Sequence, residues 1–259
     1  VTALIIMGQH TGSFYVAAFF RFVLVMIGVL SSSIVNLIFL PPKFETKIYY
    51  NSMNISSDIF VWFKLVLNDT SEFHNIKQDG DQLNSRINKL EKIFDYYNEE
   101  RPLTKKHIYQ QNRKKILFRE VVRTTRQAYE VLKRMSRYQN DLYQLNNQLL
   151  LQIKLELDSL VTLHEQIFKS LSKKARYDVT QLDYEVDNPQ KKNLMDAFQQ
   201  ELIKNPHQTQ YSYSNMMQII AEIEEYRYQL EHLDRIRLSF FTYHRSDTDI
   251  DISDEDFDL

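Results

Sequence analysis

The pattern of apolar and polar residues changes character at Pro41. Residues 22–40 (FVLVMIGVLSSSIVNLIFL) are nineteen consecutive residues without a charge. At about 1.5 Å of rise per residue, a helix of that length covers roughly 28 Å, close to the ~30 Å hydrocarbon core of a bilayer. Extended back to residue 14, the run contains one charge, Arg21. The pattern therefore predicts a transmembrane helix over residues 14–40, with Arg21 near one membrane face.

After Pro42, apolar residues recur every three or four positions in successive segments, which is typical of amphipathic helices. The most regular stripes are Leu83, Ile87, Leu90, Phe94 and Tyr97, then Leu117, Val121, Thr124, Ala128, Val131, Met135 and Tyr138, and finally Met216, Ile219, Ile223, Tyr226, Leu230 and Leu233. Gly80 is the only glycine after residue 28. A segment so poor in turn residues does not suit a β fold. The sequence predicts an all-α protein in which the transmembrane helix precedes a cytoplasmic antiparallel helical bundle.

These patterns divide the chain into three predicted parts. Residues 1–42 are expected to be the C-terminal part of a multi-span membrane domain, because one span follows a short apolar stump. Residues 43–245 are expected to form the helical domain. Residues 246–259 contain seven acidic and no basic side chains, so a disordered acidic tail is predicted there.

Small and polar residues repeat every four positions within the predicted span. Gly28, Ser32 and Asn36 would share one helix face. Residues of this kind at this spacing let membrane helices approach closely and exchange hydrogen bonds. Gly28 and Ser32 are therefore predicted to pack against another helix, while Asn36 serves either in this packing or in contact with a substrate.

Basic residues are concentrated in one segment. Residues 101–137 contain twelve basic and two acidic side chains. Five of them fall opposite the apolar stripe: Arg119, Arg123, Arg126, Lys133 and Arg137. This basic face is either solvated, held against anionic lipid headgroups, or bound to nucleic acid. The last alternative lacks stacking aromatics or a reading motif, so no nucleic-acid partner is expected. The positive charge that follows residue 40 places this side in the cytoplasm.

Catalytic signatures are missing from the sequence. There is no cysteine, which excludes disulfides, thiolate metal sites and cysteine nucleophiles. His164-Glu165 begins like a zinc-protease helix, but Phe168 occupies the position of the second histidine ligand. We therefore expect no enzyme activity, no metal and no cofactor. His10 and Arg21 are the ionisable groups of the membrane portion, and they either contact a substrate carboxylate or merely cap a turn and reach the interface.

Two parts of the sequence resemble a known family. Gly8-Gln9-His10-Thr11-Gly12, Arg21-Phe22, Val35-Asn36 and Leu40-Pro41-Pro42-Lys43-Phe44-Glu45 are similar to the last membrane segment of the aromatic acid exporters of Gram-positive bacteria, which are relatives of the fusaric-acid-resistance-like transporters. Glu99-Glu100-Arg101, Arg123-Thr124-Thr125, Ala128-Tyr129-Glu130-Val131-Leu132 and His164-Glu165-Gln166 resemble the helical domain attached to them.

The resemblance implies a multi-pass protein of the bacterial cell membrane that exports aromatic carboxylic acids or similar amphipathic anions. Its helical domain would act in assembly or gating, with lipids, further copies of the chain and a small aromatic acid as partners. The alternative is a membrane-tethered helical scaffold or regulator without a transport path of its own. Further membrane spans in the parent protein would favour transport, and a single anchor would favour the scaffold.

Overall fold

The structure is a computed structural model that describes residues 14–39, 44–68, 73–100, 105–171, 194–204 and 213–243. Every regular element in these ranges is an α-helix and none is a strand, so the predicted all-α class is confirmed for them. The chain divides into two compact units, residues 1–43 and 44–259. The predicted acidic tail lies outside the described residues, and the three-part division stays a prediction.

The first unit contains helix α2, Phe14–Phe39. Large apolar side chains are exposed on its surface: Val16, Phe19, Phe20, Phe22, Leu24, Val25, Met26, Ile27, Val29 and Leu30. A helix that is apolar all round normally lies in a protein interior or in lipid. Of the helices in the part of the chain that the structure describes, none is both long and apolar enough to cross a membrane.

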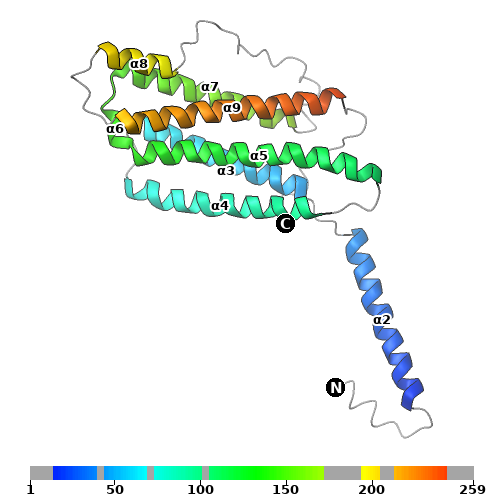
Figure 1. Cartoon of the computed structure of the whole chain (residues 1–259). Coiled ribbons are helices and arrows are strands. Elements are labelled where there is room, and N and C mark those ends of the chain that lie inside the picture. Colours follow the sequence, from blue (N-terminus) through cyan, green and yellow to red (C-terminus); the bar gives the residue numbers. More distant parts are fainter. Residues whose placement is uncertain are drawn as a thin grey trace. The chain divides into compact units, whose positions relative to one another are not determined.

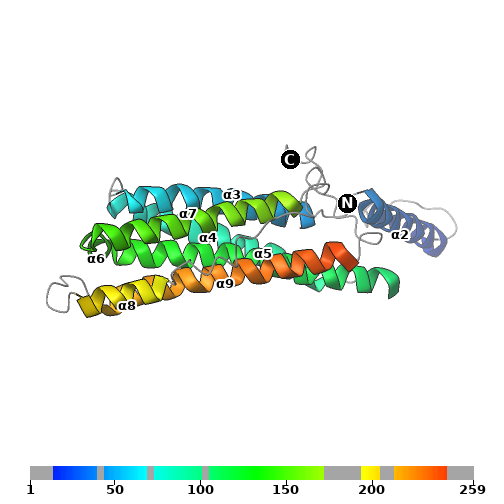
Figure 2. The ribbon, with the colours of Figure 1, turned by 90° about the horizontal axis from the view of Figure 1, so that it is seen from above.

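The second unit is built on three helices that each pack on the other two: α3 (Phe44–Leu67), α4 (Phe73–Glu99) and α5 (Lys105–Arg137). They run side by side as a bundle (Figures 1 and 2). The stripes predicted for α4 and α5 face inward, with Leu83, Ile87, Leu117, Val121 and Met135 almost completely buried. A period of 3.6 residues places such positions on one face, where burial of each side chain contributes about 1.5–3 kcal/mol.

A short helix, α6 (Gln139–Tyr143), separates α5 from α7 (Asn147–Leu171). The apolar period alone predicts one continuous helix from Leu142 to Leu171, and this prediction is wrong. Asn146 breaks the helix because its Oδ1 accepts a hydrogen bond from the backbone N–H of Gln148 at 3.1 Å. An asparagine side chain in that position caps the start of a new helix.

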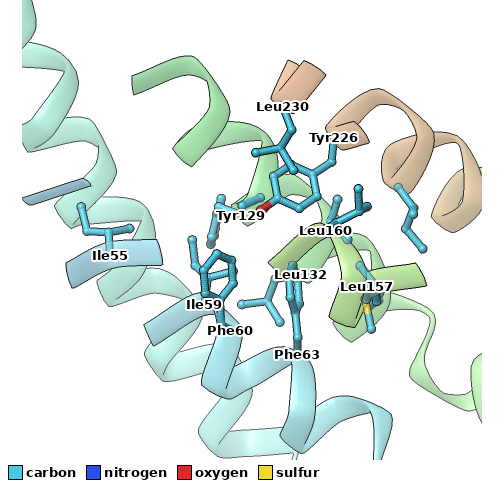
Figure 3. Close-up of a cluster of buried hydrophobic side chains, with 14 of the residues drawn as sticks. Ile55, Ile59, Phe60, Phe63, Tyr129, Leu132, Leu157, Leu160, Tyr226 and Leu230 are labelled. Atoms are coloured by element: carbon cyan, nitrogen blue, oxygen red, sulfur yellow. The ribbon is translucent and has the colours of Figure 1, made fainter. Parts of the chain in front are cut away.

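The bundle is completed by α8 (Leu194–Lys204) and α9 (Tyr213–Tyr243). Helix α9 packs along α5 and also contacts α7 and α8. Its predicted stripe, from Met216 to Leu233, is fully buried. Figure 3 shows side chains of α3, α5, α7 and α9 pointing toward one another, among them Phe60, Leu132, Leu160 and Tyr226. One core therefore joins the helices on both sides of α5.

Candidate functional site

Arg126, a member of the predicted basic face, joins α5 to α4. Its Nε donates to Glu91 Oε1 at 2.9 Å and its Nη2 to Glu91 Oε2 at 2.7 Å. The same guanidinium donates to the side-chain oxygens of Asn84 and Asn88. The hydrogen bond to Glu91 is the main cause that raises the pKa of Arg126 above its ordinary value. A planar fork with five donors suits this arrangement, so Arg126 fixes the packing of two helices.

The other four members of the basic face are exposed. Arg123 lies 3.9 Å from Glu120, and Lys133 lies 2.9 Å from Glu130, in pairs on the surface of α5. Exposed pairs of this kind contribute little to stability. Among the described residues, no carboxylate lies within ion-pair distance of Arg119 or Arg137. These two guanidinium groups are therefore the least compensated charges of the face.

Arg137 lines a pocket of about 390 Å³ formed by residues of α3, α4 and α5. We call it the basic pocket, and it is lined by Trp62, Gly80, Asp81, Leu83, Tyr129, Leu132, Lys133, Arg134, Ser136 and Arg137. Its volume falls in the range of small-molecule sites. The lining surface is mostly apolar and also includes polar and charged groups.

Three cations and one carboxylate, Asp81, line the basic pocket. Lys133 is paired with Glu130, and Arg134 donates to Glu222 at 3.1 Å. Arg137 remains as the positive charge without a partner among the described acids. An anion in this pocket would thus be attracted mainly by Arg137, by a few kcal/mol at contact distance in a medium of intermediate dielectric.

Aromatic and apolar side chains make up most of the remaining lining of the basic pocket. The Tyr129 hydroxyl donates to the backbone carbonyl of Gly80 at 3.1 Å, which holds the ring in place. Burial is the main cause that raises the pKa of Tyr129, so this phenol stays neutral. Trp62 and Leu132 offer flat apolar contact beside it. The hydroxyl oxygen of Ser136 is buried without a hydrogen-bond partner. The arrangement suits a small molecule with an apolar ring and a negative charge.

The structure places the predicted site residues in different parts of the chain. Arg21, Gly28 and Ser32 lie on α2; Arg21 is half-buried, Ser32 is exposed, and a side chain added at Gly28 would meet nothing within 4 Å. His10 and the side chain of Asn36 lie outside the described residues. The roles predicted for these five in substrate binding and helix packing stay predictions.

The basic pocket contains residues that sequence reasoning missed. It combines two members of the basic face, Lys133 and Arg137, with Arg134, Trp62 and Ser136. The sequence offered one signal, the chain's single tryptophan, which follows Ile55 and Ile59 at helical spacing. Nothing in the order of residues showed that the last turns of α3 and α5 would meet.

A known protein is similar to this chain over almost its whole length. It is 34% identical over 253 residues to UPF0421 protein YgaE of Bacillus subtilis (strain 168), a match that covers 97% of this chain and 70% of that protein. No protein-family model matches the chain. No solved structure matches it either.

Proposed function

The chain belongs to the UPF0421 family, and from its sequence and geometry we propose that it is the C-terminal part of a bacterial membrane exporter for aromatic carboxylic acids or similar amphipathic anions. In this proposal the helical domain, residues 43–245, acts in assembly or gating. The observation that supports it is the basic pocket, whose lining combines Arg137 with the apolar side chains of Trp62 and Leu132.

The chemistry of this pocket matches that of an aromatic carboxylate. The ring would lie against Trp62 and Leu132, and the carboxylate would meet Arg137. Because residues of α3, α4 and α5 line the pocket, an occupant would contact three helices at once. Binding energy that differs between two arrangements of these helices would shift their populations. In this proposal, binding of a cytoplasmic anion in the basic pocket changes the arrangement of the helical domain, and this change is passed to the membrane domain.

Membrane attachment is supported by the first unit. Its helix α2 exposes apolar side chains. The uncharged run of the sequence continues to residue 40. The described side chains of α2 end at Ser33, so the run extends beyond them. We propose that residues 14–40 lie in the bacterial cell membrane with the helical domain in the cytoplasm. Labelling of a cysteine placed at Lys47 by an impermeant reagent from outside the cell would contradict this topology.

Binding of benzoate to the chain in detergent tests the proposed pocket. Arg137→Gln removes the uncompensated charge, while Arg119→Gln removes an equal charge on the same helix outside the pocket. We expect benzoate to bind the wild type and the Arg119 variant alike. Binding to the Arg137 variant should be weaker by roughly tenfold, since a charge-assisted contact contributes about 1.5–3 kcal/mol. Equal affinity for all three proteins would refute the assignment.

Export itself is tested in cells that carry the complete parent protein. Accumulation of benzoate or a hydroxybenzoate is compared between wild type, Arg21→Ala, Arg21→Lys and Arg137→Gln at equal membrane abundance. The exporter proposal requires less accumulation in wild-type cells than in cells without the protein. Equal accumulation for every aromatic acid tested would favour the rival function, a tethered scaffold without a transport path.

The proposal includes lipids and further copies of the chain as partners. Arg119 and Arg123 extend the positive surface of α5 beyond the basic pocket, and anionic headgroups attract such a surface by about 1 kcal/mol per basic residue. Binding to liposomes with and without phosphatidylserine tests the lipid contact. A binding strength that does not depend on the anionic lipid would contradict it. Light scattering of the purified protein tests for the homo-oligomer.

A further inference from the structure

A second pocket, of about 290 Å³, lies between α3 and α7. It shares no residue with the basic pocket. Its lining residues include the apolar Met53 and Phe60 of α3 and Phe168 of α7, and the polar Ser56 and His164. We call it the α3/α7 pocket. Its composition, an apolar wall with a few polar groups, is that of sites for small organic molecules.

Two buried polar atoms in this wall have no hydrogen-bond partner. Ser56 is 2% exposed and His164 is 1% exposed. Neither Ser56 Oγ nor His164 Nε2 has a partner. Leaving a buried donor or acceptor unpaired is costly, and native proteins normally satisfy such groups with a protein atom, ordered water or a ligand. Both residues line the α3/α7 pocket, so a molecule inside it could supply the missing partners.

The hydrogen bond made by His164 Nδ1 determines whether Nε2 is a hydrogen-bond donor or acceptor. His164 Nδ1 lies 2.8 Å from the hydroxyl of Tyr226, which is fully buried. No other hydrogen bond of this hydroxyl is found among the described residues, so we assign the phenol O–H as the donor of this hydrogen bond and Nδ1 as its acceptor. A neutral imidazole that accepts at one nitrogen carries its proton on the other. His164 Nε2–H is therefore a donor that lacks an acceptor.

The pocket is electrically neutral in its interior. Burial lowers the pKa of His164 to about 3, so the ring is uncharged at physiological pH. The charged groups at the edge, Lys169 and Glu165, lie 3.6 Å apart as an ion pair. A carboxylate moved into this interior would lose its hydration without meeting a net positive charge, which is unfavourable. Neutral ligands are therefore favoured.

Aromatic rings define the shape of the site. The imidazole of His164 stacks on Phe168 with ring centres 4.4 Å apart, and it packs edge-to-face with Phe60 with ring centres 5.1 Å apart. Tyr49 holds this end of α7 because its hydroxyl donates to the carbonyl oxygen of Phe168 at 3.2 Å. The walls are thus fixed by packing and hydrogen bonding before any ligand arrives.

We propose that the α3/α7 pocket binds a small, uncharged ring compound that bears a carbonyl group. The carbonyl oxygen accepts from His164 Nε2–H, and a polar group beside it pairs with Ser56 Oγ. The ring lies against Phe60 and Phe168. This site is separate from the proposed anion site in both residues and charge preference, so the two proposals can fail independently.

Benzamide and benzoate form the matched pair of probes, because they have nearly the same size and differ in charge. The chain of residues 1–259 is studied in detergent micelles with ¹⁵N-labelled histidine. The resonance of His164 Nε2 is identified by its loss in His164→Gln. We expect a protonated Nε2 in the free protein and a shift of its resonance on addition of benzamide. The dissociation constant should be roughly 1 mM or lower for a ligand of this size.

Two serine variants locate the contact. Ser56→Ala removes the buried hydroxyl, whereas Ser57→Ala removes an exposed hydroxyl at the same pocket. We expect the first to weaken benzamide binding by roughly three- to tenfold, the usual effect of one neutral hydrogen bond, and the second to leave it unchanged. Benzoate should not shift the Nε2 resonance.

Several results would overturn the proposal. They are no binding of benzamide to the wild type, equal binding to the wild type and Ser56→Ala, or an equal effect of benzoate on His164 Nε2. Persistent contact of Nε2–H with water at saturating benzamide would also overturn it, since ordered water would then be the partner. Loss of benzoate binding in Arg137→Gln concerns the basic pocket alone.

Discussion

Removal of a single buried carboxylate should destabilise the helical bundle strongly. Arg237 on α9 is 0% exposed, and Asp234, one turn earlier, is 3% exposed. Arg237 Nε donates to Asp234 Oδ1 at 2.7 Å, and Nη2 lies 2.6 Å from the same oxygen. Nη1 has no hydrogen-bond partner, and Nη2 lacks the angle for one. Asp234 is therefore the only described group that compensates this buried charge.

The expected magnitude follows from this geometry. Asp234→Ala leaves a guanidinium without its counter-charge in the protein interior, and breaking a buried pair in this way costs about 3–5 kcal/mol. For a domain of this size, the midpoint of thermal unfolding should fall by roughly 6–20 °C. The double variant Asp234→Ala/Arg237→Met removes both charges and replaces the guanidinium with an apolar side chain. Its stability should recover to within about 2 kcal/mol of wild type.

Fluorescence of Trp62 during denaturation measures these changes, because this single tryptophan belongs to the same unit as the pair. Arg235→Met serves as control, since Arg235 is an exposed neighbour on the same helix, and its effect should stay within about 0.5 kcal/mol. A cost below about 1 kcal/mol for Asp234→Ala would refute the reasoning. So would a double variant that is no more stable than Asp234→Ala.

Three further predictions concern stability. The pKa of His164 is lowered by burial to about 3, whereas in the unfolded chain it is near 6.5. As pH falls between these values the unfolded chain binds a proton that the folded protein does not, so stability should fall by up to about 1.4 kcal/mol per pH unit. His164→Gln should lessen this slope in urea titrations at pH 7 and pH 5, and an unchanged slope would contradict the burial. Arg126→Lys cannot form the forked contact with Glu91 and should cost roughly 1–3 kcal/mol in the same titration; no loss would mean that the α4–α5 bridge is dispensable. Asn146→Ala should cost about 1 kcal/mol by removing the cap of α7, while Asn146→Asp keeps it, and equal losses in both would show that capping is not the cause.

The sequence by itself determined the helices and their buried faces. Leu83, Leu117 and Met216 could be assigned to a core because a helix repeats every 3.6 residues whatever surrounds it. The same period, continued past Leu233, reaches Arg237. The predicted stripe nevertheless ended at Leu233, because a charged residue is rarely fully buried, and only the structure showed that Arg237 is buried.

Only the tertiary structure decided what the polar residues do. In the sequence, Arg126 cannot be distinguished from the other members of the basic face, but in the fold α4 places Glu91 within hydrogen-bond distance of it. Arg137, by contrast, has no acidic partner among the described residues and lines a pocket. His164 resembled the start of a metal motif, but packing of α7 against α3 and α9 made it a buried, neutral ring next to a cavity, hydrogen-bonded to Tyr226. Periodicity is a local property of the chain. The pairing of charges and the position of cavities depend on residues up to about a hundred positions apart, and only the packing of whole helices brings these together.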